Sequence, residues 1–502
     1  MGQCKEQERK DTMTANPMSV GVRLDLEKVA YDKNGVVHMM ATLRAPDVSK
    51  DSKRNPVCVC AVIDRSGSMG GSKIDNVRRS VWKMIDHMTD EDSLALVFFD
   101  ERIETCEFRR MTSANKEVMR QAVAKVYSRG STDIGSALVA AGRLFAQYEG
   151  AANSVERVML LTDGQANVGA TAMSDFEPIL AGVRKGVTTS TFGYGNGFNE
   201  ELLTAIARQA KGNPYFIEGV DSVAKVFAAE LGGLLTCFAQ DIVLSIKSHK
   251  GASVTNVLND MDVSTRQDAD GELVTEVKVG DVYAGERRDV IVRLEFEKRP
   301  QALPRPVTLA DVRVSYRTMA DAQSVSEEAK VKVELVKSAA EATAELDKEI
   351  AEQVAILEAA NVMAEAKKMA DAGNWQGAKS FIGSSTASLR RMKTAKTAAF
   401  ADGMDKFADQ LDVDYCAGGS LSKSIGTYAY AASASRGLTS LGNSAGDSLD
   451  ADGAMNCVMS ALVADFSGSP AAGSVSVGTT TAEPPDVTNP PSTGYAKTRS
   501  SK

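Results

Sequence analysis

Short side chains that carry oxygen cluster in one loop directly after a strongly apolar stretch. Residues 57–63 are apolar throughout, and the next five residues, 64–68, read Asp-Arg-Ser-Gly-Ser. In a tight loop alternate side chains converge on one point, so Asp64, Ser66 and Ser68 offer three oxygens to a hard divalent cation. Capping of the following helix would explain one of these side chains but not the whole set.

Two later segments repeat this arrangement. Asp163 comes after a second apolar run, 158–161, and Thr132 lies in a Gly-containing loop just before a helix expected to start near Ile134. Loops at the carboxyl ends of parallel strands gather at one edge of the sheet, where such folds place their ligand sites. We therefore predict one metal site, whose ligands are Asp64, Ser66, Ser68, Thr132 and Asp163. Asp133 is interpreted as a helix cap instead.

The elements that must position these side chains form an α/β pattern between residues 57 and 235. Buried strands are predicted at 57–63, which is apolar throughout, and at 94–99, 158–161 and 187–192. Helical stretches lie between or after them, and the first, over 73–88, is clearly amphipathic. This alternation predicts a doubly wound, mostly parallel sheet with helices on both faces.

The segments on either side of this α/β domain predict a second, antiparallel domain. Residues 240–335 alternate apolar and polar side chains with a period of two, as strands of an antiparallel β-sandwich do. Residues 19–49 contain two similar runs with an Asn-Gly turn signal between them. Two strands are too few to bury a face alone. We therefore predict that they join the later sheet, so that the 57–235 domain is inserted in the sandwich.

The remaining segments are predicted to be helical or disordered. Residues 338–440 are expected to be a helical region, with a helical hairpin at Gly373-Asn374. Its apolar stripes fit a private core, and they also fit a face for oligomerisation or for a partner. The polar leader 1–18 and the tail 467–502 have the composition of disordered segments.

The five predicted ligands, in their order and spacing, resemble the metal-ion-dependent adhesion site of the von Willebrand factor A domain. The resemblance covers about 57–235 and implies a Rossmann-like fold for this segment. Two further phrases, at 190–195 and 231–235, resemble one branch of that family. This branch contains the inter-α-trypsin inhibitor heavy chains and bacterial proteins of the calcium-activated chloride channel group.

The resemblance implies a role for each side chain around Mg²⁺ or Mn²⁺. Ser66 and Ser68 would coordinate the ion directly, and Thr132 would do so in the ligand-bound state. Asp64 and Asp163 would act mainly through ordered waters. Mg²⁺ prefers six oxygens, and three neutral hydroxyls with two outer carboxylates neutralise only part of its charge. A carboxylate from a partner protein can then complete the shell of the ion.

The sequence therefore predicts a non-enzymatic, Mg²⁺-dependent protein-interaction module whose partner presents Asp or Glu. A metal-dependent hydrolase and an adaptor subunit of a ubiquitin-type complex are the alternatives. Hydrolysis usually requires a general base, and the three histidines, at 38, 87 and 249, lie away from the motif. An adaptor would need a separate catalytic subunit, because the sequence has no CxxC pair of the kind that a RING domain uses for zinc.

Composition limits the remaining possibilities. The net charge of −8 argues against nucleic-acid binding, which requires a basic surface. The sequence contains no run of 18 apolar residues, so no transmembrane segment is predicted. The polar N-terminus does not resemble a secretory signal. Seven scattered cysteines are an odd number and predict no disulfide framework. These features favour a cytoplasmic protein.

Overall fold

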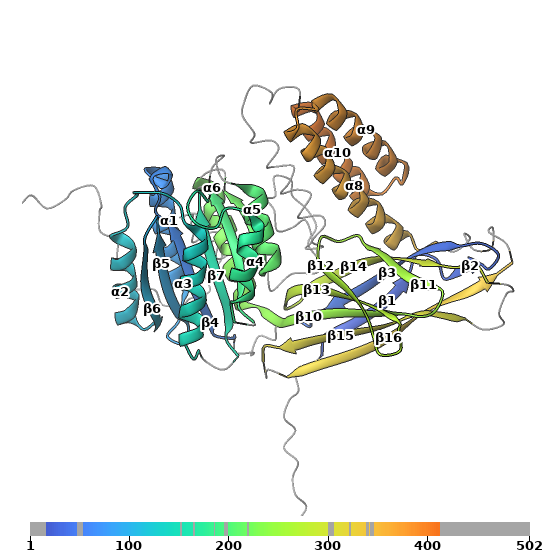
Figure 1. Cartoon of the computed structure of the whole chain (residues 1–502), viewed down its shortest axis with the longest axis horizontal. Helices are drawn as coiled ribbons and strands as arrows, with labels where there is room; N and C mark the ends of the chain where they lie inside the picture. Colours follow the sequence, from blue (N-terminus) through green and yellow to red (C-terminus); the bar gives the residue numbers. More distant parts are fainter. Residues whose placement is uncertain are drawn as a thin grey trace, which may run out of the picture.

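The computed structural model describes residues 17–411, except for 48–53, 151–152, 164–165, 185, 195–198, 218–219, 300–305, 321–322, 338–340 and 342–345. The predicted tail, the end of the predicted helical region and most of the predicted leader lie outside the described residues. Figure 1 shows an α/β domain beside a β-sandwich, with a group of helices packed over the sandwich.

The α/β domain is built on a six-stranded sheet whose strand order is β6-β5-β4-β7-β8-β9. The strands are β4 (Val57–Asp64), β5 (Ser93–Phe99), β6 (Ile103–Arg110), β7 (Val155–Thr162), β8 (Thr188–Tyr194) and β9 (Lys211–Ile217). All neighbouring pairs are parallel except β5 and β6. Every residue of β4 is buried, as expected of a strand covered on both faces. The prediction of a mostly parallel sheet is confirmed.

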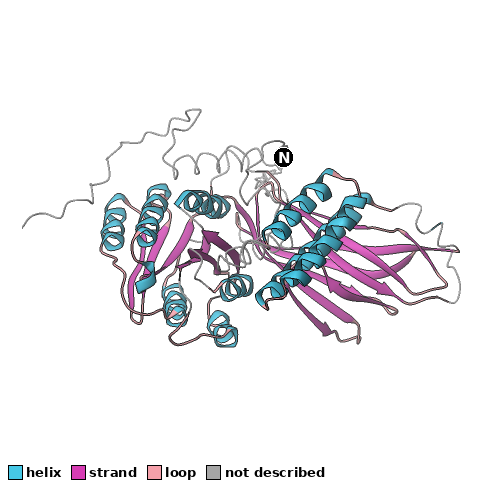
Figure 2. Cartoon of the chain, turned by 90° about the horizontal axis from the view of Figure 1, so that it is seen from above, coloured by secondary structure: helices cyan, strands magenta, loops and turns pink. Residues whose placement is uncertain are grey.

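Helices cover both faces of this sheet, which confirms the doubly wound architecture (Figure 2). One face packs against α1 (Ser72–His87), α2 (Ser113–Ala124) and α6 (Val220–Leu235). The other packs against α3 (Ile134–Gln147), α4 (Met173–Ala181) and α5 (Glu200–Gln209). The chain moves from β4 to β5 on one side and later to β7 on the other, so the topological switch point lies between β4 and β7.

The sandwich consists of two sheets, with strand orders β1-β3-β14-β11 and β12-β13-β10-β15-β16-β2. Its strands are β1 (Ser19–Leu24), β2 (Lys28–Ala30), β3 (Gly35–Arg44), β10 (Cys237–Ser248), β11 (Ala252–Val257), β12 (Asp262–Gln267), β13 (Leu273–Tyr283), β14 (Arg287–Phe296), β15 (Val307–Thr318) and β16 (Ser324–Val336).

The N-terminal strands join the later sheet, so the predicted insertion is confirmed. Strand β3 pairs with β14 over its whole length, from Gly35 opposite Phe296 to Arg44 opposite Arg287. Two details differ from the sequence prediction. The short strand β2 pairs with β16 in parallel, because these distant segments meet only in the folded chain. Met18, assigned to the leader, is fully buried, and its N–H donates to the Tyr316 hydroxyl at 3.0 Å.

A buried ionic cluster joins the α/β domain to the sandwich. Arg157, in the middle of β7, is fully buried. Its guanidinium lies 3.2 Å from Glu230 of α6 and 2.8 Å from Asp281 of β13. Three further groups donate hydrogen bonds to Glu230, namely Ser190, Asn213 and Tyr215. Because a buried charge is costly unless it is paired and hydrogen-bonded, this cluster favours one arrangement of the two domains.

Three helices form the C-terminal part of the described chain: α8 (Lys348–Asp371), α9 (Trp375–Arg391) and α10 (Ala395–Gln410). The predicted hairpin is present, since α8 ends before Gly373 and Asn374 caps α9 by accepting from the N–H of Gly377 at 3.1 Å. The first turns of α8 pack on the sandwich, and the rest forms a common core with α9 and α10. The described apolar stripes therefore serve the chain's own cores, and oligomerisation remains a prediction. None of the described helices is both long and apolar enough to cross a lipid bilayer.

Candidate metal centre

Two carboxylates leave the sheet at its topological switch point. Strands β4 and β7 are parallel neighbours with Ile63 opposite Leu161, so Asp64 and Asp163 emerge at the same sheet edge. Both residues are buried, with 0% and 3% of their surfaces exposed. Since open α/β sheets bind ligands at this position, the backbone topology alone directs both carboxylates to a candidate site.

Asp64 is held by hydrogen bonds on both of its carboxylate oxygens. The N–H of Ser66 donates to Oδ1 at 2.7 Å, and the Thr162 hydroxyl donates to Oδ2 at 2.5 Å. Burial raises the pKa of Asp64 to about 6, although these hydrogen bonds act in the opposite direction. The side chain is thus fixed beneath the loop, and a nearby cation would favour its charged form.

Ser66, Ser68 and Asp163 form a continuous chain of oxygens. The two serine hydroxyls share a hydrogen bond of 3.1 Å, and Ser68 donates to Oδ1 of Asp163 at 2.8 Å. Ser66 is buried, whereas Ser68 is exposed to solvent. Four of the five predicted ligands are therefore directly connected, because Asp64 joins the chain through the backbone of Ser66.

Thr132 approaches from a separate loop that is fastened to the first. The N–H of Gly67 donates to the carbonyl of Gly130 at 3.1 Å, and the N–H of Arg129 donates to the carbonyl of Arg65 at 2.7 Å. Thr132 itself is 2% exposed. Its N–H donates to the side-chain oxygen of Asn167 at 2.9 Å, so the loop after β7 also fixes its position.

Glycine is favoured at position 130 of this loop. Gly130 has a φ of +70°, and an added Cβ would lie 1.8 Å from a carboxylate oxygen of Glu101. That carboxylate accepts a hydrogen bond of 2.8 Å from the N–H of Ser131. The positive φ therefore favours a residue without a side chain, and a Cβ at this position would also require the exposed Glu101 carboxylate to move. The neighbouring Asp133 caps α3 and accepts from the N–H of Ser136 at 2.9 Å, as predicted.

Two arginines, one in the Asp64 loop and one in the Thr132 loop, bind the same acidic side chains and so connect the two loops. Arg65 and Arg129 both donate to Oδ2 of Asp100, at 2.9 Å and 2.6 Å. Both also contact Glu104 of β6, at 2.8 Å and 3.1 Å. Burial alone would raise the pKa of Asp100, but the hydrogen bond from Arg129 and the two positive charges lower it. No pattern in the sequence indicates this cluster, because its members come from four separate segments of the chain.

Lys73 is the principal site residue whose role the sequence did not reveal. Its ammonium group contacts Oδ2 of Asp163 and donates to the carbonyl of Ser68 at 3.2 Å. The side chain of Asp163 is 0% exposed, whereas that of Lys73 is 36% exposed. The only available signal was its place in the first turn of a helix that follows the Asp-Arg-Ser-Gly-Ser loop.

The residues present fit a hard divalent cation. Three hydroxyls and two carboxylates are the oxygen donors that Mg²⁺ and Mn²⁺ prefer. Lys73 already places a positive charge against Asp163, so a divalent cation would have to share this carboxylate with the ammonium group or displace it. Among the described residues no group of three or more His, Cys, Asp or Glu side chains could hold a metal ion. A cation at this site would therefore depend on the hydroxyl oxygens.

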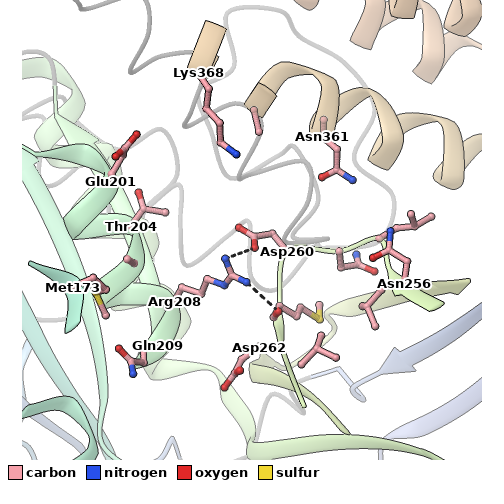
Figure 3. A pocket seen from close by; sticks show the side chains of 18 of the residues that line it. Met173, Glu201, Thr204, Arg208, Gln209, Asn256, Asp260, Asp262, Asn361 and Lys368 are labelled. Carbon is pink, nitrogen blue, oxygen red and sulfur yellow. Dashed lines mark hydrogen bonds and ion pairs between the residues drawn. The ribbon is translucent and has the colours of Figure 1, made fainter. Parts of the chain in front are cut away.

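A larger cleft lies elsewhere, among α5, the β11–β12 connection and α8. It has a volume of about 1150 Å³ and contains none of the five predicted ligands. Figure 3 shows Arg208 of α5 reaching across to the sandwich, where it pairs with Asp260 at 2.8 Å. On the opposite wall Lys367 of α8 lies 3.7 Å from Glu201 of α5. These ion pairs connect α5 of the α/β domain to the sandwich and to α8. We therefore interpret the cleft as the space between these three parts of the chain.

Comparison with known proteins settles the family of the α/β domain. Residues 59–229 match the family model of the von Willebrand factor type A domain. This segment is a von Willebrand factor type A (VWA) domain. The resemblance inferred from the five-residue pattern is therefore confirmed at the level of the domain. The match does not itself test the metal ligands.

Two solved structures share the fold over most of the chain. A von Willebrand factor type A protein from Catenulispora acidiphila superimposes with a TM-score of 0.67 at 18% identity, covering 85% of this chain and 98% of that one. The ArnB paralog VWA2 from Sulfolobus acidocaldarius gives a TM-score of 0.55 at 14% identity, covering 83% and 99%. At these identities the similarity concerns the fold alone, and it extends well beyond the VWA domain.

Sequence relatives include proteins of different kinds. An uncharacterised protein of Synechocystis is 25% identical over 60% of this chain and 73% of its own length. The inter-alpha-trypsin inhibitor heavy chain H3 of Mesocricetus auratus is 31% identical over 35% and 20%. The E3 ubiquitin-protein ligase WAV3 of Arabidopsis thaliana is 25% identical over 52% and 33%. The chain thus spans only a fifth and a third of the last two relatives.

Proposed function

We propose that this protein binds other proteins through a divalent cation held by its VWA domain. Ser66, Ser68 and Thr132 would provide direct ligands, while Asp64 and Asp163 would balance charge and orient water. The proposal rests chiefly on the hydrogen-bonded chain from Ser66 through Ser68 to Asp163 at the switch point of the sheet. Mg²⁺ is the first choice and Mn²⁺ the second, because both prefer oxygen donors.

The chemistry of these donors supports recognition of an acidic partner. Hydroxyl ligands carry no charge, and the two carboxylates are shared with Thr162, the Ser66 backbone and Lys73. A bound Mg²⁺ would therefore retain part of its positive charge and accept an Asp or Glu carboxylate from outside. The exposed Ser68 marks the side from which such a carboxylate can approach.

Titration of the full chain with Mg²⁺ in a calorimeter tests the cation site. Ser68→Ala removes an exposed hydroxyl without emptying the core, and we expect it to weaken Mg²⁺ binding at least tenfold. Ser131→Ala is the matched control, since this serine lies in the Thr132 loop but outside the proposed ligand set. Equal Mg²⁺ affinities for the two variants and the unmodified chain would refute the assignment.

One comparison favours a second candidate, an adaptor subunit of a ubiquitin-type complex. The similarity to the ligase WAV3 covers about half of this chain and reaches beyond the VWA domain. In this reading the VWA domain would bind an acidic substrate and a separate subunit would supply catalysis. Ubiquitin transfer to a VWA-bound peptide, dependent on this chain and lost on chelation of Mg²⁺, is the result that distinguishes it from a simple binding module.

A further inference from the structure

A groove runs along α3 next to the candidate metal centre. It has a volume of about 530 Å³ and lies between α3, the edge strand β6 and the region of α4. The helix contributes one continuous stripe to the groove, from Asp133 at its start to Gln147 at its end. Because Asp133 directly follows Thr132, the groove begins at the rim of the proposed cation site.

The walls of the groove suit an extended chain. Ile103 of β6 and Val139 and Ala140 of α3 are half-buried and give the groove an apolar lining. Among the strands that the structure describes, β6 is the outermost of its sheet and pairs with β5 alone. Its other backbone edge can therefore bond to an added strand, which is a common way of binding extended peptides.

The charges in the groove select the kind of peptide. Asp133 and Arg143 are its two charged lining residues. Both oxygens of Asp133 accept hydrogen bonds from Ser136, at 2.9 Å and 2.8 Å. Arg143 is exposed and forms no ion pair with the other residues that the structure describes. The groove therefore has a negative charge at the end nearest the cation site, engaged in capping α3, and one positive charge that is available to a ligand, on Arg143 further along.

The spacing between the two positive charges defines a ligand pattern. Arg143 follows Asp133 by ten residues, which corresponds to about 15 Å along an α-helix. An extended peptide advances roughly 3.3 Å per residue and its alternate side chains share a face, so residues four positions apart cover about 13 Å of this length and point the same way. Two carboxylates separated by that number of residues would match the cation at one end and Arg143 at the other.

We propose that the groove binds an extended segment of a partner protein that carries two acidic residues four positions apart. This inference rests on the proposed function, since the first acidic residue would complete the shell of the cation. The second would pair with Arg143, and the apolar side chains between them would face Ile103, Val139 and Ala140. Arg143 is thereby a specificity-determining residue of the VWA domain.

Synthetic peptides with the full chain in Mg²⁺ provide the test. The first has Asp at position 1, Ser at positions 2 and 4, Val at position 3 and Glu at position 5, so that Asp, Val and Glu share one face; the second has Gln in place of that Glu. We expect the first to bind about fivefold more tightly by fluorescence anisotropy, as one exposed ion pair allows. Arg143→Ala should remove this difference without changing the affinity for the Gln peptide, and Arg143→Lys should retain most of it.

Two failures are distinguishable. If EDTA abolishes binding of both peptides but Arg143→Ala affects neither, the groove proposal is wrong while the cation-dependent function stands. If neither peptide responds to Mg²⁺ or EDTA, the proposed function is refuted and the groove proposal falls with it. A peptide with its two acidic residues only two positions apart should bind no better than the Gln peptide, and equal binding to the first peptide would contradict the spacing.

Discussion

Replacing Lys73 by methionine should tighten the binding of Mg²⁺. The ammonium group of Lys73 contacts Asp163 and the carbonyl of Ser68, two residues that are central to the proposed cation site. A divalent cation that binds there must share Asp163 with this positive charge or displace it. Methionine keeps the length and apolar stem of lysine but removes the charge.

The size of the effect follows from two contributions. A single charge about 5 Å from a divalent cation costs roughly 1.7 kcal/mol at the dielectric constant of water. The side chain of Lys73 is 36% exposed and can turn into solvent, which relieves part of this repulsion. Turning away breaks the ion pair with Asp163, and a partly exposed pair of this kind contributes about 0.2–1 kcal/mol. Because turning away is the cheaper route, we expect a gain of at most about 1 kcal/mol, or up to about fivefold in affinity.

Calorimetric titration of Mg²⁺ into the full chain at low ionic strength measures this gain directly. Lys83→Met is the matched control, because Lys83 lies ten residues further along α1, about 15 Å away. The gain should shrink in 0.5 M salt, since screening weakens the repulsion. An affinity for Mg²⁺ that is unchanged or reduced in Lys73→Met would refute the proposed position of the cation.

Two further predictions concern the framework that positions the site. Arg157→Met should lower the free energy of unfolding by about 3–5 kcal/mol in urea, because it leaves the buried Glu230 and Asp281 without their partner; a loss below 1 kcal/mol would contradict the inferred role of the cluster. Gly130→Ala should weaken Mg²⁺ binding and cost about 1–2 kcal/mol of stability, because of the positive φ and the contact with Glu101. Unchanged thermal unfolding and unchanged Mg²⁺ affinity would show that this loop tolerates a side chain.

Several predictions from the sequence were successful because they depended on local pattern. Continuous apolar runs identified strands such as β4, since a strand covered on both faces must be apolar throughout. The Gly373-Asn374 break predicted the helical hairpin because these residues favour a helix end and a helix cap. The insertion of the VWA domain was predicted from the small number of N-terminal strands, which could not bury a face alone.

The two edge strands of the α/β sheet, β6 and β9, were not predicted from the sequence, and the reason is physical. β6 carries polar or charged side chains at most positions because one side of it faces solvent, so it lacks a continuous apolar run. β9 contains Gly212 and Pro214, which usually argue against a strand. Proline is tolerated at the edge of a sheet, where its missing N–H has no ladder partner. Both strands are therefore defined by the neighbours they pair with and not by their own composition.

The amino-acid sequence by itself determined the type of chemistry at the candidate site. Five oxygen-bearing residues stand in three loops, and their order and spacing are properties of the chain that can be read before it folds. Only the tertiary structure decided what surrounds them: Lys73 against Asp163, Arg65 and Arg129 on Asp100, and the groove that Arg143 helps to line. These contacts join residues from separate elements, and their distances are set by how helices and strands pack, which no local pattern encodes.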